Sequence, residues 1–192
     1  MKTIAFGPIH ADLPALRACF AQAEKEGFDR IVHVGGVAGD GPDPEGCVRF
    51  LYDRNIRGVR GPVDEAAAQA ADGAGRGMTL YARRLLADLP FELRKRTGGR
   101  ILAVYHGSPV DAGQPLMETT PEPRLLEAGQ ASGADILVVG GGDAFWHRQA
   151  GGRHFVGPGP LPGRPGSGMA GYAVIESDAQ VHVAFRQVPY RP

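Results

Sequence analysis

Along the first 60 residues, short apolar runs alternate with segments whose hydrophobic side chains recur at helical spacing. The apolar runs predict strands at residues 3–6, 29–34 and 57–60. The first helical segment places on one face the side chains of Leu13, Leu16, Phe20 and Ala23. Asp12 is suited to cap its start and Gly27 to end it, while Asp43 and Pro44 begin a second helix that ends near Asn55. This β-α-β-α-β order predicts parallel strands joined by right-handed crossovers, and therefore an α/β core.

The second half of the chain changes to hairpins. Pairs of strands are predicted at residues 91–105, 145–156 and 172–188. Gly98-Gly99 and Gly151-Gly152 supply the positive φ angles that tight hairpin turns need, and Asp178-Ala179 turns the third pair. The remaining predicted elements are helices at 64–77, 79–89 and 121–130 and a strand at 136–139. The parallel half and the hairpin half together predict two mixed sheets packed face to face, with helices outside them.

Composition is that of a globular protein with no general attraction for polyanions. At 192 residues and 43% hydrophobic content, we expect a single domain over residues 1–192. The 21 basic residues balance 21 acidic ones, so no net charge favours nucleic acid or an anionic membrane. Cys19 and Cys47 lie in apolar helical patterns and are too few for a disulfide framework, which is typical of a cytoplasmic protein. The start of the chain has neither a charged leader nor a long apolar stretch, so we expect no signal peptide and no membrane span.

Five loops follow the carboxyl ends of predicted strands, which is where ligands bind in open α/β sheets. They read Gly7-Pro8-Ile9-His10, Gly35-Gly36, Gly61-Pro62-Val63-Asp64, His106-Gly107-Ser108-Pro109 and Gly140-Gly141-Gly142-Asp143. Their order and spacing resemble the calcineurin-like metallophosphoesterases, in particular the small prokaryotic phosphodiesterase branch, whose pattern is D-x-H, G-D, G-N-H-D, H-G-S-P and G-H-T-H. The resemblance extends over nearly the whole chain. It implies a four-layer α-β-β-α sandwich of two mixed sheets, the calcineurin-like phosphoesterase fold.

The metal ligands of that family are mostly missing from this sequence. In the family, an Asp bridges two divalent metals, which His, Asn and Asp also bind and which position a water and the phosphate. Carried over to this chain, the first-loop Asp is Pro8, the bridging Asp is Gly36 and the Asn is Pro62. The phosphate-contacting His is Val63, and the first His of the last loop is Gly141. We therefore expect no dinuclear centre and no ordinary metal-assisted hydrolysis.

Three residues at these positions can still bind a ligand. His10 and His106 match family histidines, and Asp143 stands where the last histidine is expected. One hypothesis is that they hold a single Mn, Zn or Fe ion, as a two-histidine, one-carboxylate set. A second is metal-free anion binding, in which the two histidines act together with the backbone N–H groups of Gly35, Gly36, Gly140, Gly141 and Gly142. The structural alternative is that the histidines are hydrogen-bonded within their loops and the glycines only make turns.

The sequence favours a pseudoenzyme with a metallophosphoesterase fold. We expect it to be inactive as a dinuclear hydrolase, with no cofactor or at most one divalent metal. Its expected partner is a phosphate-bearing ligand such as phosphate or a nucleotide, or else another protein. The residues expected to bind the ligand are His10, Gly36, His106, Gly141 and Asp143. The alternatives are a weak or altered phosphoesterase that uses one metal, and a structural or regulatory subunit that forms a homo-oligomer.

Other chemically capable residues have structural interpretations. Asp40 and Asp64 are expected to cap helices or to stabilise turns. The remaining histidines are expected to be packed or exposed on strands and hairpins, although two that flank the second hairpin lie where they could reach the mouth of a cleft: His33, His182, His147 and His154. Phe145-Trp146 is suited to stacking on a base, but aromatic pairs more often belong to a core or an interface.

Overall fold

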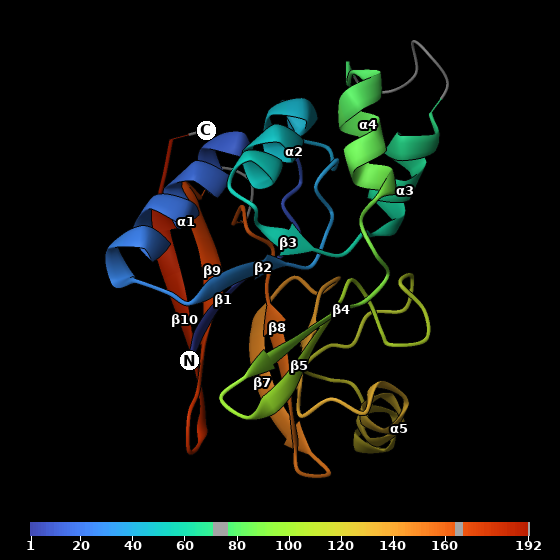
Figure 1. Cartoon of the computed structure of the whole chain (residues 1–192), viewed down its shortest axis with the longest axis vertical. Coiled ribbons are helices and arrows are strands. Elements are labelled where there is room, and N and C mark those ends of the chain that lie inside the picture. Colours follow the sequence, from blue (N-terminus) through green and yellow to red (C-terminus); the bar gives the residue numbers. More distant parts are fainter. Residues whose placement is uncertain (71–76, 164–166, 192) are drawn as a thin grey trace.

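The computed structural model describes residues 1–70, 77–163 and 167–191, and its strands form two mixed sheets (Figure 1). The first sheet has the order β10-β9-β1-β2-β3 and contains β1 (Lys2–Phe6), β2 (Arg30–His33), β3 (Arg57–Gly58), β9 (Met169–Ser177) and β10 (Val181–Pro189). The second has the order β4-β5-β6-β8-β7 and contains β4 (Leu93–Thr97), β5 (Arg100–Tyr105), β6 (Ile136–Val139), β7 (Phe145–Ala150) and β8 (Arg153–Pro158). The helices are α1 (Leu13–Glu26), α2 (Pro44–Asp53), α3 (Pro62–Gln69), α4 (Leu80–Ala87) and α5 (Glu122–Ser132).

Three hydrophobic clusters bind four layers together. Helices α1 to α4 cover the outer face of the first sheet, where Phe6, Leu16 and Leu86 are buried. The inner faces of the two sheets meet through small and β-branched side chains, and α5 covers the outer face of the second sheet through Leu125. The predicted α-β-β-α sandwich of two mixed sheets is therefore confirmed. No helix in the described ranges combines the length and apolar character needed to cross a bilayer.

Most of the predicted elements form for the predicted reasons. Strand β1 pairs in parallel with β2, and β2 in parallel with β3, while the hairpins pair β4 with β5, β7 with β8 and β9 with β10. An Oδ1 atom of Asp12 accepts the N–H of Ala15 at 2.9 Å, and Asp43 accepts that of Gly46 at 2.8 Å. These side chains satisfy N–H groups that the first turn of a helix leaves without a backbone partner. Both predicted caps are confirmed.

Two elements next to the strand ends differ from their predicted bounds. Strand β3 is shorter than 57–60, because the N–H of Arg60 donates to Pro90 and the chain turns at Gly61 into α3. Helix α3 begins at Pro62 and not at Asp64, since proline at the first helical position has the required φ angle and no N–H to satisfy. The glycine-rich end of the predicted 64–77 helix, residues 71–76, lies outside the described residues. The shift places Asp64 in the first turn of α3 instead of at its start.

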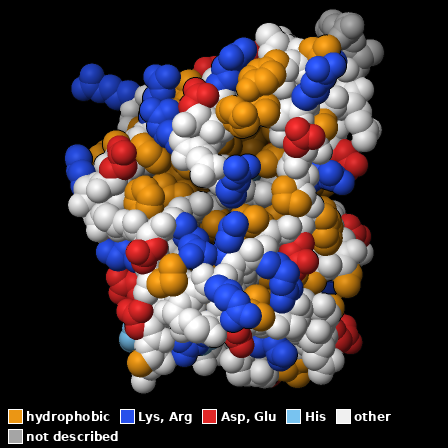
Figure 2. Space-filling model, viewed as in Figure 1, with side chains coloured by type: hydrophobic (Ala, Val, Ile, Leu, Met, Phe, Trp, Pro, Cys, Tyr) orange, Lys and Arg blue, Asp and Glu red, His pale blue; other side chains and the backbone are white. Residues whose placement is uncertain are grey.

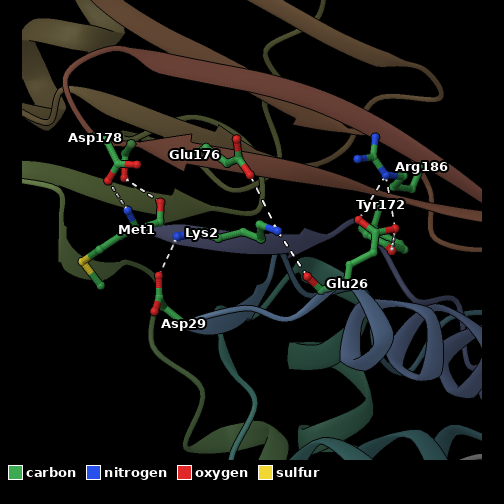
Figure 3. A network of polar contacts seen from close by, with 9 residues as sticks. Met1, Lys2, Glu26, Asp29, Tyr172, Glu176, Asp178 and Arg186 are labelled. Atoms are coloured by element: carbon green, nitrogen blue, oxygen red, sulfur yellow. Dashed lines mark hydrogen bonds and ion pairs between the residues drawn. The ribbon is translucent and has the colours of Figure 1, made fainter.

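A network of polar contacts joins the two ends of the chain beside β1 (Figure 3). The backbone N–H of Lys2 donates to Asp29 Oδ2 at 2.6 Å, and the Lys2 ammonium lies 3.7 Å from Glu176. At the end of α1, Glu26 accepts from Arg186 Nε at 3.1 Å and from the Tyr172 hydroxyl at 3.1 Å. These contacts fasten β1 and α1 to the hairpin of β9 and β10, which follows them by more than 140 residues.

Candidate functional site

The five loops that follow the strand ends meet at one edge of the two sheets. A Cβ built on Gly36 would lie 3.0 Å from the Cβ of Pro8 and 3.6 Å from Cε1 of His106. A Cβ built on Gly61 would lie 2.5 Å from the same Cε1 atom. These distances place loops after β1, β2, β3 and β5 in direct contact. Gly140 also lies against the backbone of His106, so the loops at 7–10, 35–36, 61–64, 106–109 and 140–143 lie together in a region that we call the site edge.

A hydrogen bond from the imidazole ring holds the side chain of His106 in place. Its Nδ1 atom lies 2.7 Å from the carbonyl oxygen of Val34. A carbonyl only accepts, so Nδ1 carries the proton and donates it, which leaves Nε2 as the free ring nitrogen of the neutral form. Gly61 lies against the ring, where any side chain would collide with it. The ring therefore has a defined orientation without any metal.

His10 lies on a loop with an unusual backbone. His10 and Ala11 have φ angles of +54° and +56°, in the left-handed region that residues with a side chain rarely adopt. Two hydrogen bonds stabilise this strained backbone. The His10 N–H donates to the carbonyl of Gly36 at 2.7 Å, and the Gly41 N–H donates to the carbonyl of His10 at 2.9 Å. These bonds hold the His10 loop against the loop that follows β2.

The electrostatic environment of His10 connects it with the other candidates. Desolvation by the surrounding loops is the largest effect on the pKa of His10 and lowers it. The negative charge of Asp40 is the next largest effect and raises it. His106 lowers the same pKa further, whereas Asp143 and Asp64 raise it. His10, His106 and Asp143 thus lie within electrostatic range of one another, and His10 is mainly neutral at pH 7.

Asp64 accepts a hydrogen bond at the start of α3, as expected of a cap residue, and also holds a second loop. Its carboxylate is fully buried and accepts three backbone N–H groups, from Gly36 at 2.8 Å, Ala38 at 2.9 Å and Gly61 at 2.8 Å. The bond from Gly61 resembles half of a capping box, in which an acidic side chain in the first turn accepts the N–H of the residue before the helix. The bonds from Gly36 and Ala38 tie the loop after β2 to the start of α3. Asp64 is therefore a clamp between two loops of the site edge.

Several of the glycine N–H groups considered for anion binding already have acceptors. The N–H of Gly36 donates to Asp64, that of Gly35 to Nδ1 of His33 at 3.2 Å, and that of Gly140 to the carbonyl of Tyr105 at 3.1 Å. An anion could use these three groups only by replacing an acceptor inside the protein. Gly141 lies on the exposed loop after β6, close to Pro115.

The residues at the site edge do not form a metal-binding group. Among the residues that the structure describes, no three His, Cys, Asp or Glu side chains are arranged so that they could hold a metal ion. His10, His106 and the exposed Asp143 share an edge without meeting as a ligand set. Pro8 and Gly36, which are in contact at the centre, offer no side-chain donor. The donor set present here does not fit the paired metals of the resembled family.

Three exposed apolar side chains lie on or near the segments that follow the strand ends. Val63 is 45% exposed, Val110 is 75% exposed and Met117 is 45% exposed. Val63 is in the first turn of α3, Val110 follows His106 by four residues, and Met117 lies 3.9 Å from a Cβ built on Gly142. These residues add exposed apolar surface to a region that otherwise carries histidines and carboxylates.

The other candidates identified from the sequence lie elsewhere or are part of the core. His147 and His154 stack on each other, with Nε2 and Nδ1 3.0 Å apart, on the paired strands β7 and β8. Trp146 is buried in the cluster beneath α5, which agrees with the core alternative for the Phe145-Trp146 pair. His33 is buried, and His182 is exposed on β10, as their strand positions indicated.

Adding one methyl group at Gly61 tests the packing of His106. The Gly61→Ala variant is expected to lower the free energy of unfolding by about 1–3 kcal/mol, because its Cβ would lie 2.5 Å from the imidazole and the ring would have to give up Val34. Gly142→Ala is the matched control, since its Cβ would have no neighbour nearer than 3.8 Å. Urea unfolding of both variants measures the difference. Equal stabilities would contradict the described position of the His106 ring.

The fold is a sandwich of two mixed sheets. The loops at the carboxyl ends of its strands lie together and carry His10, His106 and the buried Asp64. A family model for the calcineurin-like phosphoesterase superfamily domain matches residues 1–180. The chain belongs to this superfamily.

Solved structures agree with this assignment. A metallophosphoesterase from Sphaerobacter thermophilus is 24% identical, with a TM-score of 0.79 over 100% of this chain and 90% of that one. A hypothetical protein from Pyrococcus horikoshii is 19% identical, with a TM-score of 0.82 over 99% of this chain and 88% of that one. Vps29 from Chaetomium thermophilum is 14% identical, with a TM-score of 0.60 over 100% and 98%. No curated protein matches the sequence.

Proposed function

We propose that this chain is a non-hydrolytic member of the calcineurin-like phosphoesterase superfamily, and that its site edge binds a protein partner. One observation carries the proposal. At the centre of the edge, Pro8 and Gly36 are in contact where the resembled family has two metal-binding aspartates. Two-metal hydrolysis needs ligands that hold both ions and orient a water, and neither residue has a side-chain donor.

The loops support this proposal because hydrogen bonds within the protein hold them together. Asp64 binds the loops after β2 and β3 through three N–H groups, and His106 is oriented by the carbonyl of Val34. Clustered carboxylates become costly when no cation compensates their charge. Replacing them with Pro and Gly removes that repulsion, while a single buried carboxylate keeps the loops in place.

A protein partner agrees better with the charges of the edge than a phosphate does. The pKa of His10 is lowered, so this side chain brings little positive charge at neutral pH, and Asp40, Asp64 and Asp143 act on it with negative charge. An anion placed there would be repelled. The exposed Val63, Val110 and Met117 instead provide the apolar contacts that protein interfaces use at their centres. The chain shares its fold with Vps29, a protein whose name refers to vacuolar protein sorting and not to hydrolysis.

A hydrolysis assay tests the first part of the proposal. We expect the protein, purified without chelator and supplied with Mn²⁺, to hydrolyse bis(p-nitrophenyl) phosphate no faster than the His10→Ala/His106→Ala double variant. The alternative is a weak phosphoesterase with one metal on His10, His106 and Asp143, which the electrostatic proximity of these residues favours. Turnover that needs Mn²⁺ and disappears in the double variant would establish that alternative and overturn the proposal.

A binding assay tests the second part. Inorganic phosphate and nucleotides are expected to leave the melting temperature unchanged, whereas a protein captured from a lysate of the source organism should bind the purified chain directly. That binding should be lost in a Val110→Asp/Met117→Asp variant and kept in a Tyr52→Asp variant, which changes an exposed apolar residue on α2. A melting temperature raised by phosphate, or capture that the paired substitution leaves intact, would contradict the proposal.

We also propose a cytoplasmic location for the protein, with which the buried Cys19 and Cys47, both free thiols, agree.

A further inference from the structure

A cavity of about 770 Å³ lies between the edge strands of the two sheets, beside the loop that follows β2. Strands β3 and β4 form one side of it, and α2 with the end of α4 forms the other. Its lining is mostly aliphatic and includes Val37, Val48, Leu51, Ile56 and Leu86. Figure 2 shows hydrophobic side chains in a hollow over β3, bordered by Lys and Arg side chains. The volume is in the range of sites that enclose a small molecule.

One of the residues that line this cavity carries a buried hydrogen-bond donor. His33 has no exposed surface, it lines the cavity, and its Nδ1 atom accepts the N–H of Gly35 at 3.2 Å. Because Nδ1 acts as an acceptor, the proton of the neutral ring is on Nε2. Burial lowers the pKa of His33 to about 4, so the neutral form is the one present at pH 7.

The Nε2–H group of His33 has no hydrogen-bond partner among the described residues. Buried polar groups are nearly always paired with protein atoms, water or a ligand, since leaving a donor unpaired in an apolar environment is unfavourable. A few polar groups among mostly apolar lining residues are the arrangement by which small-molecule sites orient a ligand. An occupant of the cavity would therefore present an acceptor, such as a carbonyl, carboxylate or ether oxygen, to Nε2.

The opening of the cavity carries positive charge. Arg57 and Lys95 line it, and neither forms an ion pair with any residue in the described ranges. Both residues also line an adjoining hollow of about 520 Å³, where Arg30 and Arg54 add two more cations. The acidic residues nearby are fewer: Asp88 lines the first hollow and Asp29 the second. The surplus of cations attracts an anionic group to the opening.

We propose that this cavity binds a small amphipathic anion. Its apolar body fills the space between α2, α4, β3 and β4, its acidic group lies at Arg57 and Lys95, and an oxygen along its length accepts the Nε2–H of His33. This inference does not depend on the function proposed for the site edge.

Binding of a fluorescent probe and its displacement test the proposal on the unmodified protein. The probe 8-anilinonaphthalene-1-sulfonate, an aromatic anion of suitable size, is expected to bind saturably with one site per chain. Decanoate should displace it about tenfold more effectively than decanol, because only decanoate can make a charge-assisted bond with Arg57 or Lys95. Non-saturable fluorescence, or equal displacement by the acid and the alcohol, would overturn the proposal.

Two substitutions locate the binding within the cavity. Lys95→Gln is expected to weaken decanoate binding about tenfold and to change decanol binding less than about twofold. Arg96→Gln is the matched control, since this exposed neighbour on β4 does not line the cavity. Leu85→Trp should fill the cavity from a half-buried position and weaken both ligands. If Lys95→Gln and Arg96→Gln weakened decanoate binding equally, the assignment of the binding site to this cavity would be wrong. The same would follow if Leu85→Trp left the binding of both ligands unchanged.

A measurement on the wild-type chain tests the role of His33 even if its variants fail to fold. In ¹⁵N-resolved imidazole spectra, addition of decanoate should shift the Nε2 signal of His33 in a saturable way, at the concentrations that displace the fluorescent probe. The exposed His182 serves as the internal control and should not shift. An unchanged His33 signal at saturating decanoate would overturn the proposed contact.

Discussion

Replacing Asp64 with alanine is expected to lower the free energy of unfolding by about 3–5 kcal/mol. The buried carboxylate accepts the N–H groups of Gly36, Ala38 and Gly61, and no other acceptor is placed to take over all three. A hydrogen bond to a charged group contributes more than one between neutral groups, and each donor left without a partner adds its own desolvation cost. Asp64→Asn should lie between the wild type and Asp64→Ala, because its one amide oxygen can still accept.

Urea unfolding followed by far-UV circular dichroism measures this effect. The control is Glu65→Ala, a change at the next residue of α3, where the side chain is exposed and the expected shift is within about 0.5 kcal/mol. Hydrogen exchange gives a second measurement, because the amides of Gly36 and Ala38 should lose protection in Asp64→Ala while those of the core strands keep it. If Asp64→Ala were as stable as Glu65→Ala, Asp64 could not be the clamp that joins the two loops.

The second large expected effect is a loss of stability in mild acid caused by His33. Its pKa is about 4 in the folded protein, mainly because burial disfavours the charged ring, against about 6.5 for an unfolded histidine. The unfolded chain therefore binds a proton more readily than the folded one. His33 contributes its full stabilisation above pH 6.5 and loses it as the pH falls toward 4. The loss amounts to about 3 kcal/mol at 1.36 kcal/mol per pKa unit.

The free energy of unfolding of the wild type and of His33→Asn, measured between pH 7.5 and 4, tests this expectation. Asparagine keeps an acceptor near the position of Nδ1 for the Gly35 N–H but cannot take up a proton, so the stability of this variant should depend less on pH. The lowered pKa values of His10, His147 and His154 act in the same direction in both proteins and cancel in the comparison. His182→Asn is the control on an exposed ring and should retain the wild-type dependence. Parallel curves for the wild type and His33→Asn would contradict the buried, neutral His33.

Much of the fold could be predicted because its determinants are local. The helix of α1 follows from the spacing of its apolar side chains and from Asp12, whose partner is only three residues away. The hairpins follow from Gly98-Gly99 and Gly151-Gly152, whose positive φ angles are required by the turns themselves. The bounds of α3 were predicted less well, since Pro62 and Asp64 both fit the start of a helix and only packing against the loop after β2 chose between them.

The location of the candidate site in the fold could be predicted from the sequence, but the hydrogen bonds that arrange its residues could not. Parallel strands bring their carboxyl ends to one edge, so the positions of His10 and His106 followed from the strand order alone. The clamp by Asp64 did not, because its acceptor bonds reach 26 and 28 residues back along the chain. The same is true of His106, whose ring is oriented by a carbonyl that lies 72 residues away.

By itself, the sequence determined the order of the elements, the two mixed sheets and the absence of side-chain donors at Pro8 and Gly36, because hydrophobic period, turn chemistry and residue identity are properties of short segments. The tertiary structure alone decided that the carboxylate of Asp64 is buried and accepts three N–H groups, and that His33 is buried with an unpaired Nε2–H beside a cavity that Arg57 and Lys95 also line. The physical reason is that burial and hydrogen-bond partners are set by surfaces from distant parts of the chain, which come together only when the two sheets and their helices pack.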